Sequence, residues 1–181
     1  MDSSNREFIA GFSSSTKREI ASLTKIFTLY TACSVIGELD IDPKTHIVEI
    51  GYVAESKVGT TACLEPGDKI SLYDLLFGLM LPSGNDAAVA ISLAIGERLL
   101  ACRPSDPELK MGKSGGTLPA RRAFLKEMNS INSWYGLKNS CLQNSHGLTN
   151  TFNSSTAAEI AMLFSHGLVQ YSLFREVVNT S

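Results

Sequence analysis

Apolar residues recur at helical spacing along most of the chain. In the first such stretch, from about residue 21 to 36, apolar side chains fall at positions i, i+3, i+4 and i+7, namely Ile26, Leu29, Tyr30 and Cys33. Gly37 is then expected to end this helix as a C-terminal glycine. The pattern predicts four further helices, at about 72–80, 86–101, 119–135 and 157–168. The helix at 86–101 is apolar on almost every face, which is typical of a helix buried in the core.

Polar residues and glycines mark where several of these helices begin or end. Ser71, followed three residues later by Asp74, predicts an N-cap. Thr156 and Glu159 have the spacing of a capping box, which predicts the start of the last helix. Gly136 is expected to end the helix at 119–135.

Strand-like patterns are short and few. Phe8–Phe12 is one candidate strand, and β-rich pieces lie at 46–50 and 58–63, before a turn at 65–68. The stretch 103–117 is polar and rich in proline, glycine and lysine, which is typical of a surface insertion. We therefore predict one domain over residues 1–181, of the α+β class and mainly helical.

Composition and charge exclude some classes of partner. The chain has 181 residues, of which 44% are hydrophobic, and a formal net charge of −2, which suits a globular protein. It has no basic stripe, so a nucleic-acid partner is not expected. No apolar run has the length of a transmembrane helix.

The cysteines predict no metal or cofactor. Cys33, Cys63, Cys102 and Cys141 are widely spaced, with no CxxC pair and no histidine at metal-ligand spacing, so buried free thiols are expected. The start of the chain has no apolar core of a secretory signal. Both features favour an intracellular location, although a periplasmic or extracellular protein trimmed of its signal would have the same pattern.

Ser22 and Lys25 form an S-x-x-K tetrad at the start of the first predicted helix. Residues i and i+3 share a face of a helix, so the Lys25 amine can reach the Ser22 hydroxyl. A serine hydroxyl becomes a useful nucleophile when a neighbouring base accepts its proton, and a buried lysine of lowered pKa can be that base. The tetrad alone has low specificity, because Ser14–Lys17 matches it equally well in a polar run.

A second motif gives the tetrad at Ser22 a companion. Ser83-Gly84-Asn85 lies in a predicted turn between two apolar helices, about sixty residues further along. Such a turn can direct a hydroxyl and a carboxamide into a cleft, although most S-G-N triplets are plain interhelical turns.

Together these segments resemble the low-molecular-weight D-alanyl-D-alanine carboxypeptidases, penicillin-binding proteins of the serine β-lactamase superfamily, whose signature combines S-x-x-K, S-D-N and K-T-G. The resemblance runs from about Arg18 to the end, and its segments keep the order that the family has. Position 84 has glycine in place of the aspartate of the S-D-N motif, and in this the chain resembles the carboxypeptidase branch more than the class A β-lactamases. The segments are 18–32, 64–92, 124–129, 135–139, 144–148 and 153–164.

The resemblance implies a role for each matched residue. Ser22 is the expected acylated nucleophile and Lys25 the base for acylation. Ser83 is expected to relay a proton to the leaving group, and Asn85 to hold the substrate amide. The implied substrates are a peptide ending in D-Ala-D-Ala or a β-lactam. His146 is a further candidate base, but the resemblance implies that the segment containing it is a structural loop.

The third motif of the family, on a late strand, has no convincing match. Lys113-Ser114-Gly115 has a similar sequence. It lies in the polar insertion, between two glycines, where a buried sheet strand is not expected. The predicted fold is therefore the helical portion of the penicillin-binding fold without most of its sheet. A protein partner or a further segment is expected to cover the face on which that sheet packs.

Three interpretations stay open at this point. The first is a serine carboxypeptidase-like domain that is incomplete as given and needs a complementing segment for activity. The second is a catalytically inactive subunit with a structural role in a larger assembly. The third, a β-lactamase-like hydrolase acting on another ester or amide, has less support because no glutamate for deacylation is recognisable.

Overall fold

The structure is a computed structural model that describes residues 7–52, 59–103, 117–148 and 153–180. A 3-10 turn, η1 (Ala21–Leu23), is followed by α1 (Thr24–Glu38), α2 (Leu72–Met80), α3 (Asn85–Cys102), α5 (Leu118–Trp134), α6 (Ala157–Gln170) and α7 (Ser172–Asn179). The strands are β1 (Arg18–Glu19), β2 (Ile47–Glu49), β3 (Lys69–Ser71) and β4 (Ser154–Ser155).

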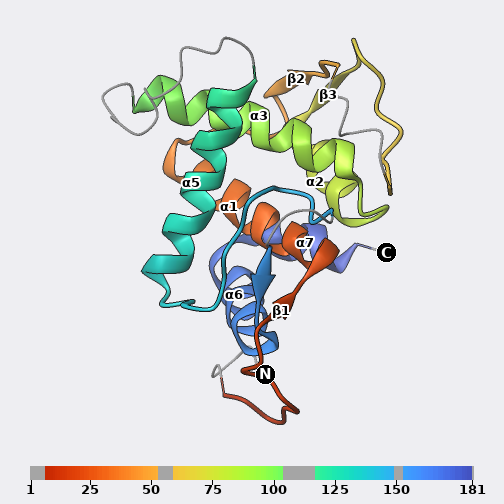
Figure 1. Cartoon of the computed structure of the whole chain (residues 1–181). Helices are drawn as coiled ribbons and strands as arrows, with labels where there is room; N and C mark the ends of the chain where they lie inside the picture. Colours follow the sequence, from red (N-terminus) through yellow and green to blue (C-terminus); the bar gives the residue numbers. More distant parts are fainter. Residues whose placement is uncertain (1–6, 53–58, 104–116, 149–152, 181) are drawn as a thin grey trace.

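Helix α1 is the centre of the molecule. It packs against α2, α3, α5, α6 and α7, with α3 on one side of it and α6 on the other (Figure 1). Phe27, Leu29 and Tyr30 of α1 are almost completely buried, as are Ile91 and Ile95 of α3. Lys25, in the first turn of α1, is therefore surrounded by the packed core.

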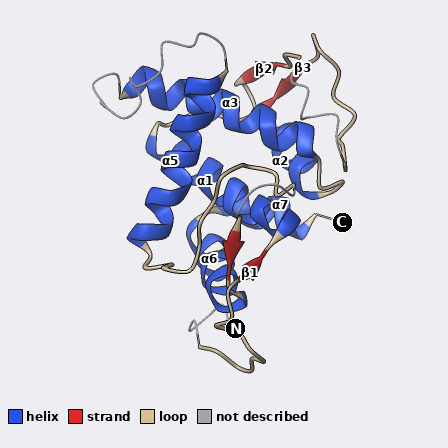
Figure 2. Cartoon of the chain, viewed as in Figure 1, coloured by secondary structure: helices blue, strands red, loops and turns tan. Residues whose placement is uncertain are grey.

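The strands form two small antiparallel pairs and no larger sheet within the described residues (Figure 2). β1 pairs with β4 so that Arg18 lies opposite Ser155, and β2 pairs with β3 so that Val48 lies opposite Ile70. The prediction of a mainly helical α+β chain is confirmed.

Two of the three predicted strands are wrong. The pattern at 46–50 does give β2, but residues 8–12 form no strand, and Phe12 is 96% exposed. None of the strand pairs among the described residues includes 8–12, and strand propensity alone does not fix a strand. In 58–63, the described residues 59–63 are irregular because the backbone of 62–64 bonds to the Asp86 carboxylate in place of a ladder.

Helix α1 continues through Gly37, so the predicted end at that glycine is wrong. The turn that ends it has Asp40 in the left-handed region, with φ 49°, and Ile41 N–H donates to Ile36 O at 3.0 Å. This is the Schellman pattern, with Asp40 at the position that glycine usually takes. Gly136 does end α5 as predicted: its φ is 67°, and Leu137 N–H donates to Asn132 O at 2.8 Å.

The predicted helix starts at Ser71 and Thr156 are correct. Ser71 Oγ accepts from Asp74 N–H at 3.0 Å, and Thr156 Oγ1 accepts from Glu159 N–H at 3.1 Å. The Glu159 carboxylate does not complete a capping box, because it accepts from Asn139 N–H at 2.9 Å and from the Ser140 hydroxyl at 2.6 Å. Glu159 therefore ties the 139–140 turn to α6.

Helix α7 was not predicted. It follows α6 after a single extended residue, Tyr171, and it buries Phe174 and Val177 completely against the core. No helix among the described residues has the length and apolar character that crossing a bilayer requires.

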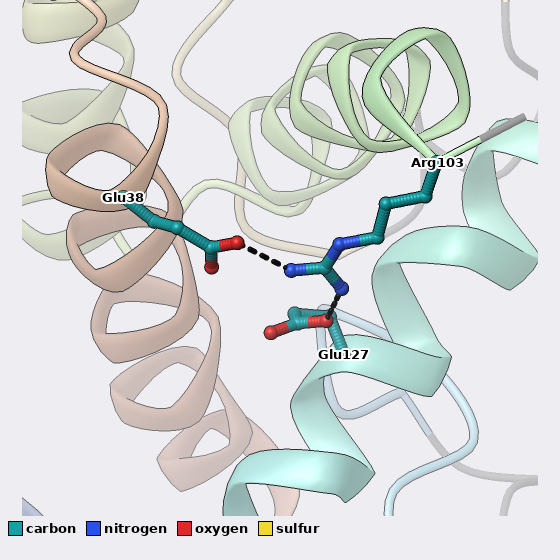
Figure 3. A network of polar contacts seen from close by, with 3 residues as sticks. All are labelled: Glu38, Arg103 and Glu127. Atoms are coloured by element: carbon teal, nitrogen blue, oxygen red, sulfur yellow. Dashed lines mark hydrogen bonds and ion pairs between the residues drawn. The ribbon is translucent and has the colours of Figure 1, made fainter.

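Arg103, at the end of α3, joins three helices (Figure 3). Its guanidinium donates to Glu38 of α1 at 2.7 Å and to Glu127 of α5 at 2.6 Å. The predicted insertion at 103–117 lies outside the described residues apart from its two end residues. Of the four thiols, Cys33 is buried as expected, but Cys63, Cys102 and Cys141 are exposed.

Candidate active site

Ser22 lies at the point where the chain enters the central helix. It is on the 3-10 turn η1, directly before α1, and its side chain is exposed. The preceding Ala21 has φ 43°, a left-handed conformation that costs energy for a residue with a Cβ. This turn presents the serine hydroxyl at the surface while Lys25, three residues later, points into the protein.

The Lys25 ammonium group makes three hydrogen bonds. Its Nζ donates to Ser22 Oγ at 3.3 Å, to Asn85 Oδ1 at 2.8 Å and to the backbone oxygen of His146 at 2.9 Å. Lys25 is only 2% exposed. An ammonium has three N–H donors, so these acceptors fix the direction of all three.

Burial makes Lys25 a candidate base. Removal from water lowers the pKa of Lys25 to about 8, and the negative charge of Asp86 raises the pKa against that effect. An ordinary lysine stays charged at any physiological pH, but this one has an appreciable neutral fraction near pH 8. The neutral amine, within reach of Ser22 Oγ, can accept the hydroxyl proton.

Ser83 and Asn85 lie in a tight turn at the start of α3. Ser83 has φ 56°, and its backbone oxygen accepts from the Thr60 hydroxyl at 2.5 Å. Asn85 N–H donates to Thr60 O at 2.8 Å. Because Asn85 Oδ1 accepts from Lys25, the carboxamide NH₂ group points away from the lysine and lies against Gly59. No hydrogen bond among the described residues joins the Ser83 hydroxyl to Ser22 or Lys25.

The loop 144–147 closes the third side of Lys25. The Asn144 side-chain oxygen accepts from His146 N–H at 3.1 Å and from Gly147 N–H at 2.7 Å. These bonds shape the loop so that the His146 carbonyl faces Lys25, while the imidazole Nδ1 accepts from Leu148 N–H at 3.2 Å. His146 thus contacts the site through its backbone.

The same loop is attached to the helix that carries Lys25. Asn153 Nδ2 donates to Thr24 Oγ1 at 3.0 Å and to Asn144 Oδ1 at 2.9 Å. Gly147 lies so close to the turn that carries Ser22 that a Cβ there would come within 1.9 Å of Ala21 O. Asn144 and Asn153 were not among the predicted site residues.

The other two motif matches lie elsewhere. Ser14–Lys17 lies in a turn closed by Thr16 N–H donating to Ser13 O at 3.0 Å, so no helix aligns its serine and lysine. Lys113-Ser114-Gly115 lies outside the described residues. Of the two S-x-x-K tetrads, the one that meets the S-G-N turn is Ser22–Lys25.

A family model for D-alanyl-D-alanine carboxypeptidase, of the S11 peptidases, matches residues 1–97, more than half of the chain. The chain belongs to this family. It is 33% identical over 168 residues to the D-alanyl-D-alanine carboxypeptidase of Streptomyces sp. strain K15, an alignment that covers 91% of this chain and 51% of that protein. It is 30% identical over 145 residues to DacF of Bacillus subtilis strain 168, covering 79% of this chain and 31% of the relative.

Solved structures of penicillin-binding proteins confirm the prediction that this chain has the helical part of their fold. The Streptomyces K15 DD-transpeptidase superposes with a TM-score of 0.79 at 27% identity, covering 100% of this chain and 63% of that chain. The carboxypeptidase DacD from Francisella tularensis superposes with a TM-score of 0.76 at 25% identity, covering 94% and 36%. The chain thus spans about half, or less, of the curated relatives named above.

Proposed function

We propose that this carboxypeptidase-family chain carries the acylation half of an active site, with Ser22 as nucleophile and Lys25 as base. One observation carries the proposal: Lys25 Nζ lies 3.3 Å from Ser22 Oγ and 2.8 Å from Asn85 Oδ1, so two motifs sixty residues apart converge on one amine. The substrates are peptides ending in D-Ala-D-Ala, with β-lactams as acylating analogues.

The chemistry follows from this arrangement. Neutral Lys25 accepts the Ser22 proton as Oγ attacks the carbonyl carbon of the penultimate D-alanine, forming a tetrahedral intermediate. The C–N bond then breaks, the terminal D-alanine takes a proton relayed through the Ser83 hydroxyl, and an ester to Ser22 remains. Water hydrolyses that ester and returns the serine. The NH₂ group of Asn85, oriented by the Lys25 bond, is placed to hold the substrate amide.

An additional segment or partner is part of the proposal, and it covers the surface beside Ser22. Phe12 and Leu23 are exposed by 96% and 50%. Phe12, Leu23 and Ile160 also line an open pocket of about 380 Å³ next to the nucleophile turn. Apolar surface gathered in this way is typical of an interface. The covering segment would supply the cation for the substrate carboxylate and a second oxyanion donor.

The same exposed residues support a second candidate function. An inactive subunit that docks through this surface would use Phe12 and Leu23 for assembly and would retain Ser22 and Lys25 without turnover. The two candidates differ in one property, which is whether Ser22 reacts.

Labelling with a fluorescent penicillin tests the choice. We expect covalent fluorescence on the chain in its natural assembly, loss of fluorescence in Ser22→Ala, and full labelling in the matched control Ser14→Ala, which alters the other S-x-x-K tetrad. Absence of label on the protein in its natural assembly, where an active relative labels completely, would reject acylation and leave the structural subunit.

A further inference from the structure

Asp86 is a buried carboxylate directly beside the candidate site. It is the second residue of α3 and is 4% exposed. Its oxygens accept from the Thr61 hydroxyl at 2.5 Å and from three backbone N–H groups, those of Ala62 at 2.8 Å, Leu64 at 3.1 Å and Ala87 at 2.9 Å. All four donors are neutral, so the carboxylate has charge-assisted hydrogen bonds with no cation among these partners.

Those bonds attach one particular segment to the start of α3. With Thr61, Ala62 and Leu64 held by Asp86, the neighbouring Thr60 is placed against the turn that carries the S-G-N motif. There Thr60 donates its hydroxyl to Ser83 O and accepts from Asn85 N–H at 2.8 Å. The left-handed conformation of Ser83, φ 56°, is therefore supported by a segment that Asp86 keeps in place.

Gly84 makes room for this carboxylate. A Cβ at position 84 would lie 2.8 Å from Asp86 Oδ1 and 2.6 Å from Gly78 O. Any side chain in the middle of the S-G-N motif would push the Asp86 carboxylate or the α2 backbone away. The position of the Asp86 carboxylate therefore depends on the absence of a side chain at Gly84.

The charge of Asp86 also acts on Lys25. The groups that contact the Lys25 amine are the Ser22 hydroxyl from η1, the Asn85 carboxamide from α3 and the backbone carbonyl of His146, whose imidazole is on the same loop. All three contacting groups are uncharged. Among the described residues, Asp86 is the carboxylate whose field raises the pKa of Lys25. Burial alone would raise the pKa of Asp86, but hydrogen bonds from Ala62, Thr61, Leu64 and Ala87 outweigh burial and lower it, so Asp86 stays charged while Lys25 titrates.

We propose that Asp86 is a positioning residue for this site, which fixes the Ser83–Asn85 turn through the segment 60–64 and supplies the anion that balances the Lys25 ammonium. The acylation half of this proposal rests on the proposed function, but the effect of Asp86 on Lys25 does not. Two separate consequences follow for Asp86→Asn. The turn loses its support, and the ammonium loses its counter-charge.

The pH profile of penicillin acylation separates these two effects. In Asp86→Asn the maximal rate at high pH should fall by roughly tenfold or more, because small misplacements of positioning groups can cost up to about 10² in rate. The midpoint of the rise should move below the value of about 8 expected for Lys25 in the unaltered chain, since the neutral amine is easier to form. A purely structural role would lower the rate and leave the midpoint in place.

Two further variants of the full chain serve as controls. Thr61→Val removes one hydrogen bond to Asp86 but keeps the charge, so the maximal rate should fall by several-fold with an unchanged midpoint. Asp74→Asn removes an equivalent first-turn aspartate from α2, which caps its helix through Ser71. It should change neither the maximal rate nor the midpoint. If Asp86→Asn does not fold, an unchanged maximal rate in Thr61→Val overturns the positioning role.

A measurement without turnover keeps this proposal separate from the proposed function. NMR of the full chain labelled with ¹³C-lysine, with the Lys25 resonance assigned by its loss in Lys25→Arg, reports the Lys25 titration whether or not Ser22 reacts. We expect a midpoint near 8 in the unaltered chain and a lower one in Asp86→Asn. Equal midpoints, or a higher midpoint in Asp86→Asn, would overturn the proposal. Failure of penicillin to react with the unaltered chain would reject the proposed function alone.

Discussion

Lys25 Nζ lies 2.8 Å from Asn85 Oδ1, although the two residues are sixty positions apart in the chain. Lys25 is in the first turn of the central helix α1, and Asn85 is the first residue of α3. The contact therefore forms only when these helices pack together through the core. Because both residues are almost fully buried, the amine and the carboxamide are held in one geometry and cannot reorient as surface side chains do.

Replacement of the lysine tests its role as a base. Lys25→Met keeps a long apolar stem but removes the amine, so penicillin acylation should slow by about 10²–10⁴. Lys69→Met, at a surface position where the lysine is 69% exposed beside Glu49, is the matched control and should acylate at the unaltered rate. Time courses of covalent labelling measure both. A Lys25→Met rate within a few-fold of the unaltered chain would mean that another group accepts the serine proton.

The pH dependence of acylation has a predicted sign. In the proposed reaction the neutral form of Lys25 is the base, and burial lowers the pKa of Lys25 to about 8. The rate should therefore be low at pH 6, rise through a midpoint near pH 8 and level off above pH 9. Stopped-flow measurement of acylation with a chromogenic cephalosporin between pH 6 and 10 gives this profile. A rate that is constant over this range, or that falls with pH, contradicts a lysine base.

Gly147 is expected to be intolerant of a side chain. It has φ 84°, and a Cβ would meet the Ala21 carbonyl at 1.9 Å, so Gly147→Ala should shift the nucleophile turn and cost at least about 1–3 kcal/mol of unfolding free energy. The control is Gly37→Ala. Gly37 lies in the last turn of α1, and a Cβ there would have no other atom within 4 Å, so this change should raise the unfolding free energy by up to about 1 kcal/mol. Urea unfolding monitored by circular dichroism measures both changes. Equal stabilities of the two variants would show that the close approach of 147 to 21 is wrong.

The exposed apolar surface predicts that residues 1–181 alone are prone to association and have low thermal stability. Phe12 and Leu23 line the same pocket at the turn that carries Ser22 and are 96% and 50% exposed, so the isolated chain should self-associate or unfold below about 60 °C. Phe12→Ser should reduce that association, whereas Trp134→Ser, a change of an 85% exposed residue on α5, should have little effect. Sedimentation velocity and thermal unfolding report both properties. A monodisperse monomer that unfolds sharply above about 60 °C would show that the surface needs no cover.

Local signals predicted the local parts of the structure. The i, i+3 spacing placed Lys25 against Ser22, and the N-cap residues Ser71 and Thr156 gave the starts of α2 and α6. Helix α7 was not predicted, although Phe174 and Val177 have helical spacing. Gly37 was misleading because a solvent-facing glycine is tolerated inside a helix that tertiary contacts hold on other faces.

Long-range support for the site could not be predicted in this way. The His146 carbonyl that holds Lys25 is a backbone atom, which every residue has, so no sequence pattern marks it. The contacts of Asp86 with Thr61 and Ala62 join segments more than twenty residues apart, through an irregular stretch whose composition suggested a strand. The motifs therefore predicted which residues converge at Lys25, and only the packed chain showed which residues hold them.

The most direct test of the central claim is to locate the penicillin adduct by mass spectrometry after trypsin digestion. The sequence suits this test, because cleavage at Arg6, Lys17, Arg18 and Lys25 places Ser14 in the peptide 7–17 and Ser22 in the peptide 19–25, where it is the only serine. We predict a penicilloyl mass increase on peptide 19–25, absent from Ser22→Ala. An adduct on peptide 7–17, on the peptide that contains Ser83, or on none of them in the complete natural protein would contradict it.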